Sequence, residues 1–325
     1  MTDFDVVVAG GGIAGLTAGL TSARLGRSTL VLTGGPPGGL LLSIEKIDGV
    51  PGFPEGVPGF ELCPLVEEQA AESGAEFRLA ELTRIESQDG GWLVRSGEGD
   101  FAARAVILAT GSRLKELGVP GEERLRGRGV SHCASCDAPL LGGRIVGVVG
   151  GGDSALQEAL TLAAAVSQVI VFHRGDSLSA QDAYRRRVLE HPKVEIRYGT
   201  VVEEILGDET VTGARTRDLA TGTVSEVELG AVFVYVGLQP NIELLQNGLR
   251  SNGDGRVETD GWMRTELSGV FAAGIVRRDA VGRAASAAGE GASAAVAADR
   301  YLAGESWPER VEQATPAPAE GGSDG

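Results

Sequence analysis

Cysteine is scarce in this sequence, with three residues, and so is histidine, also with three. So few cysteines argue against the disulfide framework of a small secreted domain. A structural zinc site needs a second paired cluster of ligands, which the sequence lacks, so we expect no metal. Positive charge is in deficit too, because 29 Lys and Arg oppose 45 Asp and Glu. The net charge of −16 repels the phosphates of nucleic acids and anionic membranes, and we expect neither as a partner.

Long hydrophobic runs are also absent. No apolar stretch is long enough to span a bilayer. Residues 1–5 lead into an apolar strand without the basic start or cleavage site of a signal peptide. These features predict a cytoplasmic protein. The chain of 325 residues suits two domains, and its 50 glycines suit the tight turns of nucleotide-binding α/β folds.

A glycine turn gives the first specific signal. The apolar strand Val6–Ala9 runs into Gly10, Gly12 and Gly15, and a helical stretch from Leu16 to Leu25 follows. This GxGxxG pattern between a strand and a helix predicts a dinucleotide-binding unit, because glycine lets the backbone approach a pyrophosphate at the helix N-terminus. The next strand ends without the carboxylate that usually binds the ribose.

The same pattern restarts in the middle of the chain. An apolar strand, 144–149, precedes a second glycine turn and a helix to Ala165, and the turn comprises Gly150, Gly152, Asp153, Ser154 and Ala155. The repeat predicts an α/β fold with two Rossmann-like, three-layer dinucleotide-binding domains, the second inserted into the first.

The expected boundaries follow from this layout. Residues 1–114 plus 243–304 form the first domain and 115–242 the second, with crossings near 112–118 and 239–244. The acidic tail, 305–325, is rich in Pro, Glu, Gly and Ser and is expected to be disordered.

A pair of cysteines opens the second domain. Cys133 and Cys136 are separated by two residues, so they can close into a disulfide that two electrons reopen. A nearby positive charge, helix end or flavin lowers the pKa of one thiol and makes its thiolate the nucleophile. The adjacent carboxylate of Asp137 is placed to exchange the proton that this chemistry moves.

With these motifs in place, the chain resembles the low-molecular-weight thioredoxin reductase family of FAD-linked disulfide oxidoreductases. The resemblance runs from about Asp5 to Leu302. It rests on eight stretches: Gly10–Gly15, Thr33–Gly39, Ile47–Pro54, Ala109–Gly111, Gly127–Asp137, Gly150–Ala155, Val236–Asn241 and Gly269–Gly274.

The resemblance implies two cofactor sites. For FAD it implies Gly10, Gly12, Gly15, Thr33, Gly38, Gly39, Leu40, Ala109, Thr110, Gly111, Gly274, Ile275, Arg283 and Ala284. For NAD(P)H it implies Gly150, Gly152, Asp153, Ser154, Ala155, His173 and Arg174.

The resemblance also implies roles and partners. Cys136 exchanges electrons with the flavin, Cys133 attacks the substrate, and Asp137 protonates the leaving thiolate. A homodimer is implied, in which the inserted domain swivels so that nicotinamide and dithiol reach the flavin in turn. The partner is a thioredoxin-like protein or a small-molecule disulfide or dithiol.

Several positions depart from the family pattern. Of the three arginines that bind the 2′-phosphate of NADPH, only Arg174 remains, which weakens selection for NADPH. Ile275 replaces the acid that binds the ribityl chain, and Leu40 replaces a glutamine near the flavin. Arg283 stands where the family has glutamine, and we hypothesise that it stabilises the reduced anionic flavin.

The sequence thus predicts a thioredoxin-reductase-type enzyme that passes electrons from NAD(P)H through FAD to the Cys133–Cys136 disulfide. The alternative is a relative that does not use NAD(P)H, either a ferredoxin-linked reductase or an oxygen-dependent dithiol oxidase. The altered 2′-phosphate site favours the alternative, and the intact second glycine turn favours the reductase. A flavin-free nucleotide-binding protein is a third possibility, and it would leave the cysteine pair without a role.

Overall fold

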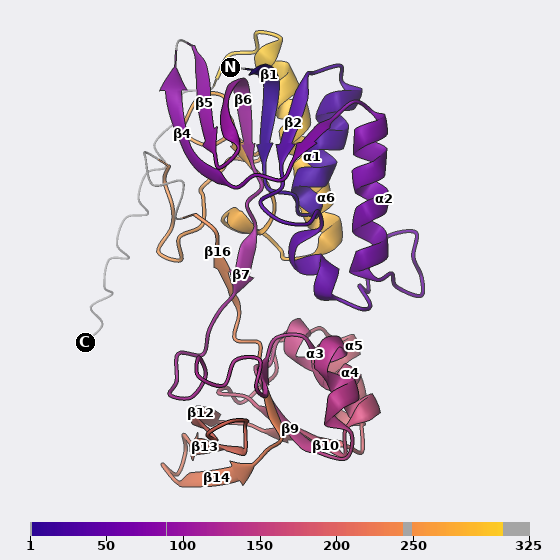
Figure 1. Cartoon of the computed structure of the whole chain (residues 1–325), viewed down its shortest axis with the longest axis vertical. Helices are drawn as coiled ribbons and strands as arrows, with labels where there is room; N and C mark the ends of the chain where they lie inside the picture. The colour runs from indigo at the N-terminus through magenta and orange to yellow at the C-terminus, as the bar shows by residue number, and fades with distance from the viewer. Residues whose placement is uncertain (1, 89, 243–248, 308–325) are drawn as a thin grey trace, which may run out of the picture.

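The protein has two lobes joined by a narrow link (Figure 1). The computed structural model describes residues 2–88, 90–242 and 249–307. The link consists of β7 (Ser112–Leu114) and β16 (Leu238–Pro240), which pair in antiparallel fashion. The two crossings expected from the sequence fall on this link, although residues 243 and 244 of the second crossing lie outside the described residues.

The first lobe is a sheet covered by helices. Its strands are β1 (Thr2–Ala9), β2 (Thr29–Leu32), β3 (Glu76–Arg78), β4 (Leu82–Gln88), β5 (Gly91–Ser96), β6 (Gly99–Leu108) and β17 (Val270–Ala272). They form a seven-stranded sheet in the order β3-β2-β1-β6-β5-β4, with β17 also paired to β6. The helices are α1 (Ile13–Arg24), α2 (Gly59–Glu72) and α6 (Ala284–Leu302), with 3-10 turns η1 (Gly39–Ser43) and η4 (Gly274–Val276).

β1 lies at the centre of this lobe because both of its faces are apolar. Val6 and Val8 pack with residues of α1 and α6, whereas Val7 and Ala9 pack into the core on the opposite face. Alternate side chains of a strand point to opposite faces, so a continuous apolar run is buried on both sides. This burial fixes the register in which β1 delivers the glycine turn that follows it.

The second lobe has three layers. Its parallel sheet contains β8 (Val130–Ser131), β9 (Ile145–Val149), β10 (Gln168–Phe172), β11 (Val194–Arg197) and β15 (Ala231–Val234) in the order β11-β10-β9-β15-β8. The helices are α3 (Ala134–Asp137), α4 (Asp153–Ala165) and α5 (Asp182–Leu189), with the 3-10 turn η2 (Ala138–Leu141). A separate antiparallel sheet contains β12 (Thr200–Leu206), β13 (Gly213–Asp218) and β14 (Val224–Glu228). α4 and α5 pack on one face of the parallel sheet and the antiparallel sheet on the other.

Two segments differ in part from what their sequence predicts. Residues 194–223 are hairpin-like in sequence, and β12 and β13 do pair in antiparallel fashion from Thr200, but β11 joins the parallel sheet beside β10. The four residues of β11 are half-buried, and pairing with β10 satisfies the backbone groups on one side of this edge strand. The many glycines and prolines between Gly34 and Gly59 predict no regular structure, yet this segment contains η1 and an isolated bridge between Ile47 and Val57.

The predicted fold class, an α/β protein with two Rossmann-like units, is confirmed at the level of sheet order and layers. In the described ranges, no helix combines the length and apolarity that crossing a membrane requires. Residues 308–325 of the predicted disordered tail lie outside the described residues, so that expectation stays a prediction.

Candidate functional site

The first glycine turn is shaped by direct contacts between backbone atoms. Gly10 has a φ of +117°, and a Cβ on it would lie 2.1 Å from the carbonyl oxygen of Ala109. A Cβ on Gly15 would lie 1.8 Å from the Gly10 carbonyl oxygen, so only glycine lets α1 approach the turn. At Gly12 a Cβ would meet nothing within 4 Å, because this glycine faces open space.

This open space belongs to a cavity of about 850 Å³. A volume near the upper end of the ~300–1,000 Å³ typical of ligand sites suits a dinucleotide. The first turn of α1 carries no acidic residue and no side-chain cap, so its backbone N–H groups are available to an anion. The residues present therefore fit FAD, whose pyrophosphate would lie at Gly12 and the start of α1.

Almost all of the predicted FAD residues line this cavity. They are Gly10, Gly12, Thr33, Gly38, Gly39, Leu40, Ala109, Thr110, Gly111, Gly274, Ile275, Arg283 and Ala284. Gly15 does not line it, because its place is in the contact between α1 and the turn. Their roles toward FAD stay predictions, and their common location supports them.

The loss of the ribityl-binding acid at Ile275 is accompanied by a different carboxylate, which the sequence analysis missed. Glu290 of α6 lines the cavity, and its Oε2 accepts a hydrogen bond of 2.8 Å from the Gly274 backbone N–H. Its Oε1 lies 2.9 Å from Arg277 Nη2, and these side chains are only 12% and 14% exposed. An acidic group thus lies beside the Gly274–Ile275 segment. A carboxylate amid the small residues of α6 was the signal available in the sequence.

The second glycine turn leads from β9 into α4. Of its predicted residues, only Ser154 lines the cavity. The His173 ring covers the turn, because a Cβ on Gly151 would lie 2.2 Å from its Nδ1. The backbone N–H groups of Ser179 and Ala180 donate to the Gly151 carbonyl oxygen at 2.9 and 3.2 Å. Asp153 begins α4, and its Oδ1 accepts a hydrogen bond of 2.6 Å from the Gln181 N–H.

Two of the three arginines of α5 are paired with a carboxylate. Arg185 and Arg186 both form ion pairs with Asp182 on the same helix, at 3.2 and 2.6 Å. Their guanidinium groups are therefore poor substitutes for the two missing phosphate-binding arginines, and Arg174 is the retained member of that set.

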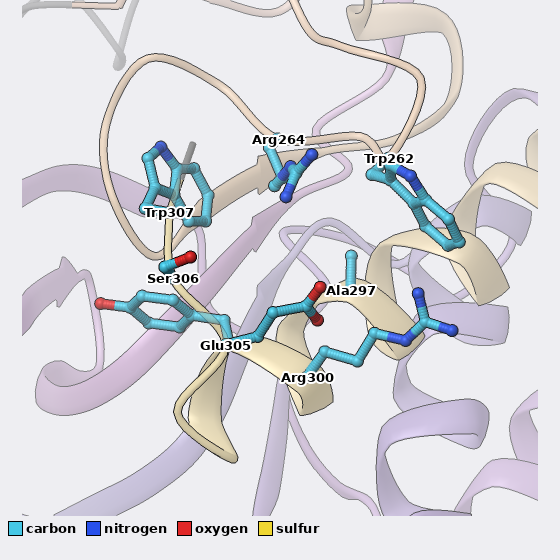
Figure 2. A pocket seen from close by; sticks show the side chains of 8 residues that line it. Trp262, Arg264, Ala297, Arg300, Glu305, Ser306 and Trp307 are labelled. Atoms are coloured by element: carbon cyan, nitrogen blue, oxygen red, sulfur yellow. The ribbon is translucent and has the colours of Figure 1, made fainter. Parts of the chain in front are cut away.

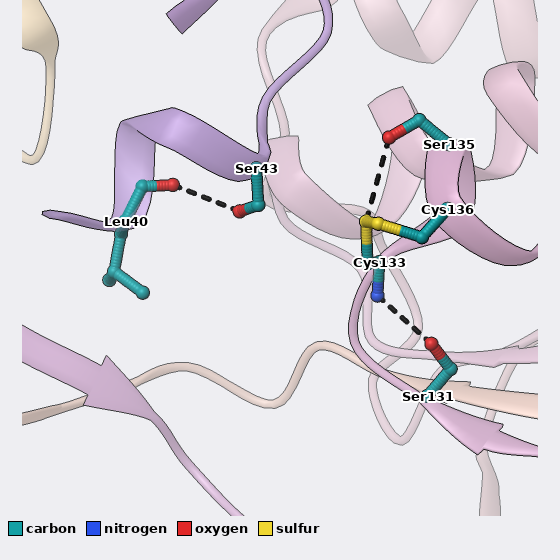
Figure 3. The surroundings of a disulfide bond; sticks show 6 residues. All are labelled: Leu40, Ser43, Ser131, Cys133, Ser135 and Cys136. Carbon is teal, nitrogen blue, oxygen red and sulfur yellow. Dashed lines mark hydrogen bonds between the residues drawn. A yellow bond between two sulfur atoms is a disulfide. The ribbon is translucent and has the colours of Figure 1, made fainter. Parts of the chain in front are cut away.

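The two cysteines form the predicted disulfide, with Cα atoms 5.3 Å apart. Cys133 is half-buried and directly precedes α3, whereas Cys136 is exposed. The Cys133 Sγ lies 3.6 Å from the Ser135 Oγ, and its backbone N–H donates to Ser131 Oγ at 3.1 Å (Figure 3). The half-buried Asp137 ends α3.

The disulfide lies at the rim of the large cavity. Neither cysteine lines the cavity, but the preceding residue, His132, does. The surroundings of the disulfide include Leu40 and Ser43 of η1, in the first lobe (Figure 3). The disulfide therefore lies close to the cavity without forming part of its wall (Figure 3).

The second lobe contributes a titratable group to the cavity wall. Glu158 of α4 lines the cavity, and burial, assisted by the negative charge of Glu45, raises its pKa to about 7. A hydrogen bond from the Ala134 backbone N–H, beside Cys133, opposes this shift. Tyr235 also lines the cavity, and its hydroxyl is buried.

A second hollow, of about 130 Å³, lies at the C-terminal end of α6 (Figure 2). The Arg300 guanidinium lies 4.6 Å from the centre of the Trp262 ring, and Arg264 pairs with Asp260 at 2.8 Å. Since none of the predicted site residues lines this hollow, we assign the function to the large cavity and the disulfide beside it.

Comparison with known proteins agrees with this geometry. A model of the pyridine nucleotide-disulphide oxidoreductase family matches residues 4–292. The chain belongs to this family. Thioredoxin reductase of Treponema pallidum is 37% identical over 301 residues, which are 93% of this chain and 98% of that protein.

Solved structures of the same family superpose on the chain. Lactococcus lactis thioredoxin reductase in its FR conformation gives a TM-score of 0.90 at 34% identity, covering 92% of this chain and 99% of that one. Thioredoxin reductase of T. acidophilum gives 0.88 at 32% identity, covering 92% and 98%. The predicted membership of the low-molecular-weight thioredoxin reductases is confirmed, and the protein is a flavin-dependent disulfide oxidoreductase.

Replacing Glu290 by Ala should destabilise the first lobe, because it leaves Arg277 nearly buried and unpaired. Removing one partner of a buried pair costs about 3 kcal/mol. Thermal unfolding and the FAD retained after gel filtration measure the effect. The control Glu258→Ala breaks a more exposed pair, with Arg278 at 51% and Glu258 at 30% exposed, and a pair of this kind contributes about 1 kcal/mol or less. Equal losses in both variants would contradict the structural role of Glu290.

The stability of the protein should depend on pH through Glu158. The pKa of Glu158 is about 7 in the folded protein and 4.5 for an ordinary glutamate, the value expected in the unfolded chain. Between pH 4.5 and 7 the folded protein therefore keeps a proton on Glu158 that the unfolded chain loses. Stability therefore falls as the pH rises from about 4.5 through 7. Glu158→Gln should remove this loss and gain on the order of 1–3 kcal/mol over wild type between pH 5 and 8.

Thermal unfolding across this pH range measures the difference between Glu158→Gln and wild type. The control Glu123→Gln alters a side chain that is 84% exposed, and it should follow wild type at every pH. A constant offset between Glu158→Gln and wild type would show that Glu158 does not titrate in this range.

Proposed function

We infer that the protein reduces the disulfide of a thioredoxin-like protein with electrons from a reduced pyridine nucleotide. The observation that carries this inference is one cavity lined by both lobes, with the first glycine turn in its wall, Ser154 of the second turn also lining it, and the partly exposed disulfide next to it. FAD, when bound in the cavity, supplies two-electron transfer between the nucleotide and the disulfide.

The chain's own groups account for the exchange with the partner. Once the disulfide is reduced, the Cys133 thiolate attacks one sulfur of the partner's disulfide and a mixed disulfide forms. The N–H groups at the start of α3 and the Ser135 hydroxyl 3.6 Å away favour this thiolate. The Cys136 thiolate then attacks the Cys133 sulfur, and the partner leaves with both sulfurs reduced. We assign protonation of the leaving thiolate to Asp137, the residue that follows Cys136 in the chain.

Two exposed apolar residues follow the disulfide closely in the sequence, and they suit contact with a protein partner. Leu140 of η2 is 80% exposed and the neighbouring Pro139 is also exposed. An exposed leucine next to a reactive bond contributes apolar area to a docking surface without blocking a small molecule. We therefore favour a protein substrate over a low-molecular-weight disulfide.

The electron donor is NADPH or NADH. The family implies a pyridine nucleotide, and the second glycine turn supports it. Since only Arg174 of the phosphate-binding set remains and Arg185 and Arg186 pair with Asp182, we expect weak discrimination between the two donors. The same observation favours the second candidate, a ferredoxin-linked reductase or an oxygen-dependent dithiol oxidase.

The remaining organisation stays a proposal. We assign residues 1–114 plus 243–304 to the FAD domain and 115–242 to the nucleotide and disulfide domain, with the lobes swivelling about β7 and β16. The homodimer is a prediction from the family, which light scattering after gel filtration measures. The cytoplasmic location is a prediction from the sequence.

Anaerobic titration of the oxidised holoenzyme tests the donor. NADPH and NADH should each bleach the flavin, with NADPH favoured by no more than about 10- to 150-fold in apparent affinity, because the one retained phosphate contact is worth roughly 1.5–3 kcal/mol. Absorbance at the flavin maximum is the measurement. If neither nucleotide bleaches the flavin while a dithiol reduces it fully, the second candidate replaces the reductase.

Leu140→Asp should lower kcat/KM for thioredoxin at least fivefold, because it replaces an exposed apolar side chain four residues after Cys136 by a charge. Turnover of a small aromatic disulfide should stay within twofold of wild type. The matched control is Leu189→Asp, a 62% exposed position on α5. Equal losses with thioredoxin and the small disulfide would refute a docking role for Leu140.

A further inference from the structure

An ion pair connects the two lobes at the mouth of the large cavity. Arg283, the residue before α6 in the first lobe, pairs through Nη1 with Oδ2 of Asp153, the first residue of α4 in the second lobe. Arg283 lines the cavity, so the pair lies where the second glycine turn faces it. The guanidinium is therefore engaged by the other lobe, which offers an alternative to the flavin-stabilising role hypothesised from the sequence.

The Asp153 carboxylate of this pair is held in place by hydrogen bonds within its own lobe. Gln181, the residue that precedes α5, donates its backbone N–H to Asp153 Oδ1 at 2.6 Å and its side-chain Nε2 to Oδ2 at 2.8 Å. The Asp153 side chain is 16% exposed and that of Arg283 is 44% exposed. A carboxylate fixed by its own lobe loses little conformational freedom when it pairs, so the ion pair is more effective than one between two free side chains.

A second set of contacts joins the lobes beside the cavity. The Tyr184 hydroxyl of α5 donates to Asp48 Oδ2 at 3.1 Å and lies 3.2 Å from Gln157 Oε1. Gln157 Nε2 donates to the Lys46 carbonyl oxygen. Asp48 and Lys46 belong to the first lobe, whereas Gln157 and Tyr184 belong to α4 and α5. The two lobes are thus in contact at two separate points, through an ion pair and through hydrogen bonds.

Both sets of contacts between the lobes stabilise the same relative arrangement of the lobes. In this arrangement α4 places Ser154, Gln157 and Glu158 in the cavity wall, while neither cysteine lines the cavity. The face that carries the second glycine turn is presented to the FAD site, and the exposed Cys136 is presented to solvent. The contacts at Asp153 and Tyr184 are lost if the lobes turn to bring the disulfide into the cavity.

We propose that Arg283 is a positioning residue that holds the nucleotide-binding face of the second lobe against the FAD cavity through Asp153. It thereby sets the balance between two half-reactions, reduction of the bound flavin by a pyridine nucleotide and its exchange of electrons with the Cys133–Cys136 pair. This inference rests on the proposed function for the first half-reaction only. Tyr184 supports the same arrangement from the second point.

The test compares Arg283→Gln and Arg283→Lys with wild-type holoenzyme under anaerobic stopped flow. Weakening a partly exposed pair shifts a two-state balance about two- to fivefold. In Arg283→Gln the rate of flavin reduction by dithiothreitol should rise by about that factor, and the rate with NADPH or NADH should fall by up to the same factor. Arg283→Lys keeps the charge and should lie between this variant and wild type.

Two further readouts do not depend on turnover. Hydrogen–deuterium exchange in the peptides that cover the start of α4 and residues 44–57 should increase in Arg283→Gln, and Tyr184→Phe should increase exchange in residues 44–57. The flavin midpoint potential of Arg283→Gln should equal that of wild type. Arg278→Gln is the matched control, because it removes an arginine that pairs with Glu258 inside the first lobe. It should change none of these quantities.

The outcomes separate this inference from the proposed function. If Arg283→Gln shifts the midpoint potential and leaves exchange and the dithiol rate as in wild type, Arg283 acts on the flavin and the inference is overturned. If neither nucleotide reduces wild-type flavin, the proposed donor is wrong. Faster dithiol reduction and greater exchange in Arg283→Gln would still support the positioning role in that case.

Discussion

The structure depends on backbone atoms that touch at the start of α1 with no side chain between them. A Cβ on Gly15 would lie 1.8 Å from the Gly10 carbonyl oxygen, and one on Gly291 of α6 would lie 2.1 Å from the carbonyl oxygen of Ala14. The backbone of α1 therefore packs directly against the glycine turn, and the backbone of α6 packs directly against α1. Dense packing of the first lobe and the opening at Gly12 are consequences of the same contacts. A side chain at either position would push a helix away and deform the cavity.

The parts of the molecule that the sequence predicted well are those encoded by neighbouring residues. Both glycine turns, the apolar strands beside them and the cysteine pair are local patterns, because turn geometry and strand burial act over a few residues. The apolar run Val6–Ala9 identified a strand buried on both faces, and the structure shows this burial. The close spacing of Cys133 and Cys136 likewise predicted the disulfide that the structure contains.

The features that could not be predicted from the sequence are contacts between segments far apart in the chain. Glu290 approaches Gly274 only because α6 folds back over η4. Tyr184 and Asp48 are 136 residues apart in the chain, and no sequence pattern around either residue predicts that the two come into contact. Arg283 was assigned to the flavin from its place in a motif, yet its side chain pairs with the opposite lobe. Contacts of this kind are set by the packing of whole lobes, which single-sequence patterns do not describe.

The chain's one free cysteine within the described residues has a practical consequence for following the reaction. Cys63 is fully buried on α2 beneath Gly38, and burial raises its pKa to about 11. An alkylating reagent at neutral pH therefore finds no reactive thiolate there in the folded protein. The mass added to the intact protein then counts only the sulfurs of the Cys133–Cys136 pair. Mass spectrometry of quenched samples can thus report the oxidation state of the active pair directly, without engineering the chain.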